Sequence, residues 1–230
     1  MDDPERILTA LQLGDSFFPS GAFAHSSGLE TFVADGLVCR REHLVLFIES
    51  YLIGLVARCD LLFVKLSHGS ARKGDVEELA RLGRLMQALI KPKELRAASI
   101  QMGRQVLQVM KDLYPSALLQ SLGQCLEGRE LRAHHPVIFG AVCGGIGIEM
   151  EGTLLTYLYS LVSALVSAGV RLIPIGHLDG QHAVHELKPL MAGLARAVET
   201  LGEADISAFA PALEVRAMQH ERLTTRLFKS

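Results

Sequence analysis

The 230-residue sequence has little net charge and few cysteines. Its formal charge at pH 7 is only −2, so nothing marks the whole chain as a nucleic-acid-binding protein. No two of the four cysteines form a C-x-x-C pair, which excludes a zinc ribbon and a thioredoxin-type motif. Each cysteine lies in a stretch rich in leucine, valine or glycine, and we therefore predict reduced, part-buried thiols.

The motifs of several common enzyme classes are also absent. The sequence has no G-x-x-x-x-G-K-[ST] loop for phosphate and no G-x-S-x-G nucleophile turn. His185-Glu186 and His220-Glu221 lack the second histidine that an H-E-x-x-H zinc site requires. These absences exclude P-loop enzymes, α/β-hydrolases and zincins.

The first residues, Met1–Glu5, are acidic and have no apolar core of a signal peptide, which favours a cytoplasmic location. One uncharged segment, Thr153–Val170, has the minimum length of a membrane-spanning helix. No second such segment exists, and charged residues flank both of its ends. We therefore predict a buried core helix and no membrane contact, with a single-span membrane protein as the competing interpretation.

Most of the chain has the apolar period of helices, and strand-and-turn patterning is missing. We predict an all-α fold: one compact domain over residues 1–230, with about ten helices around the apolar Thr153–Val170 helix. Among them are a helix at His25–Ala34 and a long helix at Arg41–Gly69 that bends at Gly54. The glycine-rich segment Pro136–Ile148 is also predicted to be helical, and its glycines permit close contact with another helix.

Three histidines, His177, His182 and His185, form the strongest candidate for a metal site. His182 and His185 are three residues apart and can share one face of a helix, and imidazole suits nickel as well as zinc. A small histidine-based metal-binding enzyme is therefore the alternative functional hypothesis. The other interpretation is that these are ordinary polar residues at a helix start, and it predicts neither a metal site nor a cofactor.

Three groups of residues together resemble the UreF family of urease accessory proteins. The first is the N-terminal motif, residues 11–30, with the sequence LQLGDSFFPSGAFAHSSGLE. The second comprises E-L-R at 94–96, H-x-P at 134–136 followed by Phe139-Gly140, and R-L-I-P-I-G at 171–176. The third is the C-terminal sequence from Met218 to Ser230, which is similar to the family's H-E-x-x-x-x-R-L-[FY]-x-S ending. The resemblance extends over nearly the whole chain, although His177 replaces a glutamine that is frequent in the family.

This resemblance implies a function in urease maturation. UreF-family proteins are all-α, non-catalytic homodimers without a permanent cofactor. They act as chaperone-like scaffolds: they bind the accessory protein UreD, also called UreH, and recruit the nickel-carrying GTPase UreG. The assembly docks on apo-urease and supports GTP-dependent nickel insertion, so nickel is delivered to urease.

Two segments are the predicted partner-binding sites. In the N-terminal motif we select Phe23, His25, Ser26 and Glu30. Phe23 is either an exposed anchor for the GTPase or a core residue. Ser26 or Ser27 is predicted to cap a helix. In the C-terminal tail, defined as residues 216–230, we select Arg216, His220, Glu221, Arg226, Leu227 and Phe228. The tail is basic and carries apolar anchors, so we predict that it folds back or docks on the UreD-type partner, against the alternative of a frayed basic end.

Overall fold

A computed structural model of the chain describes residues 3–208, 215, 216, 218 and 227–229. Every regular element in this part of the chain is helical. The α-helices are α1 (Pro4–Gly14), α2 (Leu29–Ala34), α3 (Arg41–Tyr51), α4 (Asp60–Arg72), α5 (Val76–Leu89), α6 (Lys93–Leu113), α7 (Ala117–Glu127), α8 (His135–Ile146), α9 (Met150–Leu172) and α10 (His177–Val198). Short helical turns are η1 (Ala22–Ala24), η2 (Leu52–Val56) and η3 (Glu203–Asp205). The all-α prediction is confirmed.

Side-chain caps explain where several helices begin. The Asp75 carboxylate accepts the Glu78 amide at 3.0 Å before α5, and the Ser116 hydroxyl accepts the Leu119 amide at 3.3 Å before α7. Each bond satisfies a backbone donor that has no partner inside the helix. Local sequence chemistry therefore sets these boundaries.

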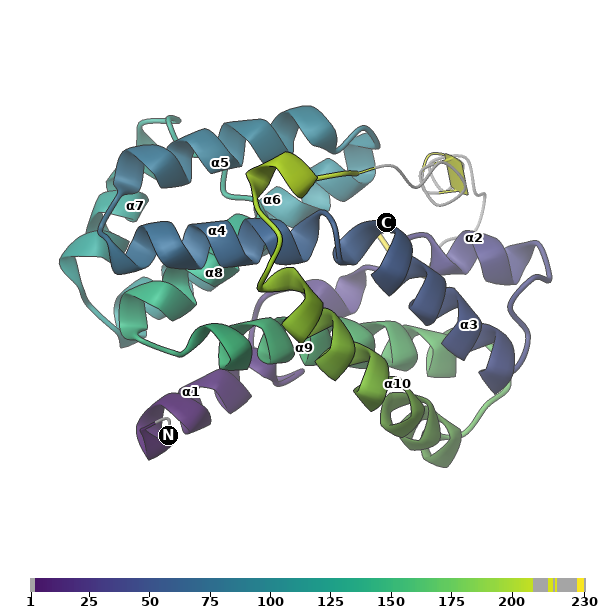
Figure 1. The fold of residues 1–230 in the computed structure, drawn as a ribbon. Coiled ribbons are helices and arrows are strands. Elements are labelled where there is room, and N and C mark those ends of the chain that lie inside the picture. The colour runs from purple at the N-terminus through teal and green to yellow at the C-terminus, as the bar shows by residue number, and fades with distance from the viewer. Residues whose placement is uncertain (1–2, 209–214, 217, 219–226, 230) are drawn as a thin grey trace.

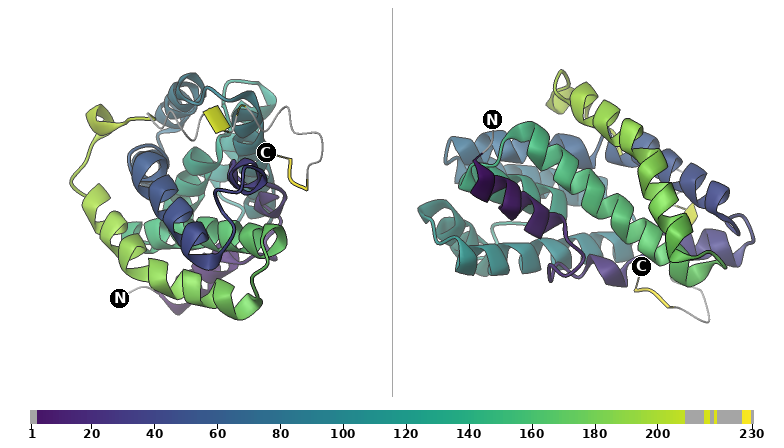
Figure 2. Two further views of the ribbon diagram at one scale, coloured as in Figure 1. Left: turned by 90° about the vertical axis from the view of Figure 1, so that its right-hand side faces the viewer. Right: turned by 90° about the horizontal axis from the view of Figure 1, so that it is seen from below.

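Helix α9 is the central element that the sequence predicts. It contacts α1, α2, α3, α4, α8 and α10, while α5, α6 and α7 lie on the far side of α4 and α8 (Figure 1). Two views at right angles show α1 and α10 packed against α9 (Figure 2). Within the described residues, α9 is the one helix long and apolar enough to cross a membrane, and half of its apolar window is buried inside the fold.

Helices α4 and α8 pack with their backbones in close contact. A Cβ atom at Gly140 would overlap the Val64 carbonyl oxygen, and one at Gly144 would lie 2.5 Å from the His68 carbonyl oxygen. Only glycine leaves room for this approach, so the predicted close contact of the glycine-rich helix is confirmed.

Three details of the sequence prediction are wrong. The helix expected from His25 begins at Leu29, because Ser27 and Gly28 have left-handed φ values of 52° and 88°. The helix expected over Arg41–Gly69 is interrupted: α3 passes into the π-helical turn η2, which contains Gly54, and α4 begins only at Asp60. The four thiols are free, but Cys39 is exposed where we expected partial burial.

Candidate functional site

The turn that leads into α2 places three polar residues of the N-terminal motif, His25, Ser26 and Glu30, inside the protein. The left-handed conformations of Ser27 and Gly28 reverse the chain just before α2. Ser26 is fully buried, and its hydroxyl accepts the Glu30 amide at 3.5 Å. Ser26 thus serves the first turn of α2, although Gly28 holds the capping position itself.

Glu30 fixes the end of the chain to this turn. Its two carboxylate oxygens accept the backbone amides of Leu227 at 2.7 Å and Phe228 at 3.2 Å. Glu30 is buried, and a buried carboxylate is costly without hydrogen-bond donors. Hydrogen bonds from backbone amides to a carboxylate are among the stronger ones in proteins, so these two hold residues 227 and 228 firmly against α2.

The Phe228 ring is the apolar half of the same contact. Phe228 is 4% exposed, and the Arg171 guanidinium lies over its ring at 4.3 Å from the centroid. Such a cation–π arrangement adds to the burial of the ring. The next residue, Lys229, donates its amide to the Ala24 carbonyl at 2.8 Å, whereas Leu227 is 74% exposed.

A second contact joins the start of the tail to α2. The Arg216 carbonyl accepts the Thr31 hydroxyl at 3.3 Å, and the Arg216 guanidinium pairs with the Asp35 carboxylate. The same guanidinium lies 5.7 Å from the centroid of the Phe32 ring. Arg216 and the segment 227–229 therefore both lie beside α2 (Figure 1).

His25 is buried next to the docked tail. Burial lowers the pKa of its imidazole, and the charge of Lys229 lowers it further. The neutral form is therefore favoured at pH 7, where a protonated ring would oppose the docked lysine.

The structure brings four of the predicted residues together: His25, Ser26, Glu30 and Phe228, with Leu227 on the outside. Their role in partner binding stays a prediction. His220, Glu221 and Arg226 lie outside the described residues, and so does the Phe23 side chain, although its backbone belongs to η1. Sequence reasoning gave no role to Arg171, whose only signal was its place in the R-L-I-P-I-G segment.

The three histidines of the metal hypothesis do not converge. His177, His182 and His185 all lie in α10 and are exposed. Across the described residues, no group of three or more histidine, cysteine, aspartate or glutamate side chains could hold a metal ion.

Comparison with known proteins places the chain in a family. The UreF family model matches residues 38–188. The chain belongs to the UreF family. The chain is 33% identical to the urease accessory protein UreF of Bacillus sp. (strain TB-90) over 225 residues, which cover 98% of this chain and 99% of the relative. It is 36% identical to the UreF protein of Geobacillus kaustophilus (strain HTA426) over 231 residues, which cover 98% and 99%. The resemblance noted in the sequence is confirmed, and this UreF-family chain is an accessory protein and not an enzyme.

Loss of the Phe228 ring should release the tail. Burying such a side chain stabilises by about 1.5–3 kcal/mol, so we expect Phe228→Ala to increase the undocked population by roughly tenfold to a hundredfold. Amide hydrogen exchange at Leu227 and Phe228 measures this population directly. Leu227→Ala is the matched control, because Leu227 is exposed and its removal should change exchange less than about twofold. Equal exchange in both variants would contradict the anchoring role of the ring.

Proposed function

We propose that this protein is a non-catalytic scaffold of urease maturation. It binds a UreD/UreH-type accessory protein as a homodimer, recruits a UreG-type GTPase and supports GTP-dependent nickel insertion into apo-urease in the cytoplasm. It needs no cofactor of its own. Membership of the UreF family supports the role in urease maturation, and the names of the similar Bacillus and Geobacillus proteins agree with it.

The docked tail is the observation that carries the proposal. Glu30 and Phe228 hold the chain end in place, while the adjacent Leu227 remains 74% exposed. An apolar side chain on a rigidly held backbone loses little conformational entropy when a partner covers it. Residues 227–229 and α2 together therefore offer a preorganised surface for the UreD-type protein.

A second apolar surface supports a role in protein assembly. On α1 and just after it, Ile7, Leu8, Leu11 and Phe17 are 47%, 66%, 64% and 94% exposed. Exposed large apolar groups gathered on one helix are typical of protein-binding surfaces. A scaffold that contacts several proteins requires more than one such surface.

A co-expression pull-down with the cognate UreD-type and UreG-type proteins tests the proposal. We expect the full chain to capture both, and a chain truncated before Met218 to lose the UreD-type protein.

Leu227→Asp should weaken capture of the UreD-type protein at least about tenfold, because a charge would be buried without a partner. The matched control is Leu178→Asp on α10, where the leucine is 72% exposed. Full capture by the Leu227→Asp variant would contradict the tail's role, and capture of neither protein by the full chain would contradict the scaffold role.

A further inference from the structure

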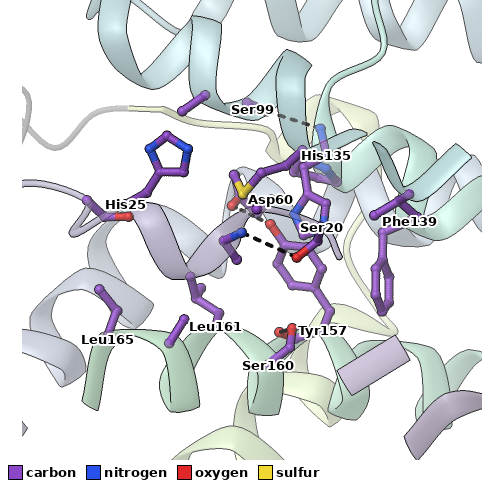
Figure 3. Close-up of a pocket in the computed structure, with 18 of the residues that line it drawn as sticks. Ser20, His25, Asp60, Ser99, His135, Phe139, Tyr157, Ser160, Leu161 and Leu165 are labelled. Carbon is purple, nitrogen blue, oxygen red and sulfur yellow. Dashed lines mark hydrogen bonds between the residues drawn. The ribbon is translucent and has the colours of Figure 1, made fainter. Parts of the chain in front are cut away.

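A cavity of about 380 Å³ lies beneath the N-terminal motif, between α9 and the starts of α4 and α8. Figure 3 shows Asp60, His135 and Tyr157 gathered at one end, with Leu161 and Leu165 of α9 along one wall. The volume is within the range of small-molecule sites, which are mostly apolar with a few convergent polar groups. This cavity has that composition, and one of its lining residues is His25, which also lies next to the docked tail.

The polar end of the cavity is built around the Asp60 carboxylate. The Tyr157 hydroxyl donates to it at 2.8 Å. Asp60 is the first residue of α4, where the positive end of the helix dipole favours a negative charge. Burial nevertheless raises the pKa of Asp60 to about 6, because that dipole and a single neutral donor only partly replace its hydration.

No described residue that lines the cavity supplies a positive charge to balance Asp60. The lining includes two acidic side chains, Asp15 and Asp60, and neither lysine nor arginine. In a mostly apolar enclosure, such a carboxylate attracts a cation far more strongly than it would in water. Charge complementarity therefore points to a cationic ligand.

Aromatic rings pack together around Tyr157, whose hydroxyl contacts the carboxylate. The Tyr157 ring lies 5.3 Å from the Phe139 ring and 5.4 Å from the His135 ring, measured between centroids, and Tyr51 lines the same end of the cavity. Burial raises the pKa of both tyrosines and lowers the pKa of His135 to about 4, so these rings are neutral at pH 7. Neutral π-faces next to a carboxylate are the combination that binds ammonium groups.

The backbone departs from regular helix where it forms this wall. The π-helical turn Leu52–Val56 and the break at Cys59 lie between Tyr51 and Asp60, and both of these residues reach the cavity. Single π-turns frequently occur at functional sites, because they redirect side chains at a cost in helix regularity. An uninterrupted helix over Arg41–Gly69 would place these side chains differently.

We propose that this cavity binds a small organic cation, with its ammonium group at Asp60 among the rings of Tyr157, Phe139 and His135, and its apolar body against Leu161 and Leu165. The proposal does not depend on the role in urease maturation. An organic cation is favoured over a bare metal ion, because no group of three metal-binding side chains occurs in the described part of the chain. The apolar side chains of the walls also suit the carbon skeleton of an organic cation, whereas a hydrated metal ion would need hydrogen-bonding groups there.

Tryptamine is a suitable probe, because the sequence contains no tryptophan and the indole fluorescence of the ligand can be excited at wavelengths that tyrosine does not absorb. Its neutral analogue tryptophol and its acidic analogue indole-3-propionate have the same apolar body. Because a hydrogen bond to a charged group contributes about 1.5–3 kcal/mol, we expect tryptamine to bind at least about tenfold more tightly than tryptophol and the acid to bind more weakly still. Equal binding of all three, or binding of none, would overturn the proposal.

Asp60→Asn removes the charge with little change in shape and should weaken tryptamine binding at least about tenfold. Asp15→Asn is the matched control, since Asp15 also lines the cavity but is exposed, and its effect should stay within about twofold. If Asp60→Asn and Asp15→Asn lose equal affinity for tryptamine, binding depends only on the overall negative potential of the cavity. That result would overturn the assignment of the ammonium site to Asp60.

The wild-type protein provides a second readout that needs no variant. Asp60 faces Tyr51, Cys59, Tyr157 and His135, and the two tyrosines and His135 keep their charge state between pH 7 and 5. The lining also contains Asp15 and His25, and burial lowers the pKa of His25 below its usual value. Tryptamine remains an ammonium ion over this range, as a lysine does. Binding should therefore weaken as pH falls through about 6, where Asp60 takes up a proton. Affinity that is constant from pH 7 to 5 would contradict the role of the carboxylate.

Discussion

Replacing Gly140 with alanine will lower the free energy of unfolding by about 3 kcal/mol, the upper end of the usual cost of overpacking a well-packed core. The new methyl group would overlap the Val64 carbonyl oxygen, which belongs to the backbone of α4 and cannot rotate away. Helices α4 and α8 must move apart, and the apolar contacts along their whole interface weaken together. The substitution therefore costs more than the usual effect of one methyl group.

Gly69→Ala is the matched control, because Gly69 lies in α4 itself and no neighbouring atom is within 4 Å of its added Cβ. Alanine is the better helix former, so this variant should gain about 0.5–1 kcal/mol. Urea unfolding measures both changes from the midpoint at an unchanged slope. A Gly140→Ala variant as stable as the wild type would show that the two helices do not depend on this close approach.

The features that could be predicted from the sequence are those that local patterns specify. The uncharged run at Thr153–Val170 has no second such segment in the sequence, which favoured a core helix over a membrane span, and the run lies within α9. The cap follows from an aspartate, Asp75, placed just before a helix, and the close helix contact follows from the glycines within α8. Each of these inferences needs only a short window of sequence.

The geometry of the candidate site could not be predicted in this way. The contact between Glu30 and Phe228 joins residues 198 positions apart, and nothing local to either residue indicates the other. The late start of α2 depends on a left-handed Ser27, a conformation that serine adopts only where the surrounding structure imposes it. The cavity depends on the π-turn after Tyr51, which apolar periodicity does not reveal. These features result from tertiary packing.

Acidification will destabilise the folded protein well above the pH at which ordinary carboxylates titrate. The pKa values of His134 and His135 fall from 6.5 to about 4, mainly because both imidazoles lose hydration: His134 is fully buried, and His135 is half-buried and lines the cavity. His134 is also held in its neutral form: its Nε2 donates to the Gln87 Oε1 atom at 2.9 Å, and its Nδ1 accepts from the Ser99 hydroxyl at 3.2 Å. That hydroxyl in turn accepts the His135 amide at 3.1 Å. Protonation of His134 would break this network.

The sign of the effect follows from proton uptake. Between pH 6.5 and about 4 the unfolded chain protonates both histidines and the folded chain does not, so stability falls as pH falls. Asp60 acts in the opposite direction, because its pKa rises from 3.8 to about 6 and the folded chain binds that proton first. His134 and His135 outweigh the one carboxylate by about 2–3 kcal/mol from pH 7 to pH 5. Burial also lowers the pKa values of His25 and His68, which adds to the loss in the same direction.

Urea unfolding at pH 7 and pH 5 measures this loss, and one variant assigns it. His135→Phe removes one titrating ring while keeping an aromatic group against Phe139 and Tyr157, so the loss on acidification should shrink by about 2 kcal/mol. His182→Gln removes an exposed histidine of α10 and should leave the loss unchanged. Equal pH dependence in all three proteins would show that the buried histidines do not control acid stability. If the free energy of unfolding falls equally in the wild type and the His182→Gln control, and falls less in His135→Phe, the histidines at the start of α8 limit the pH range in which the fold is stable.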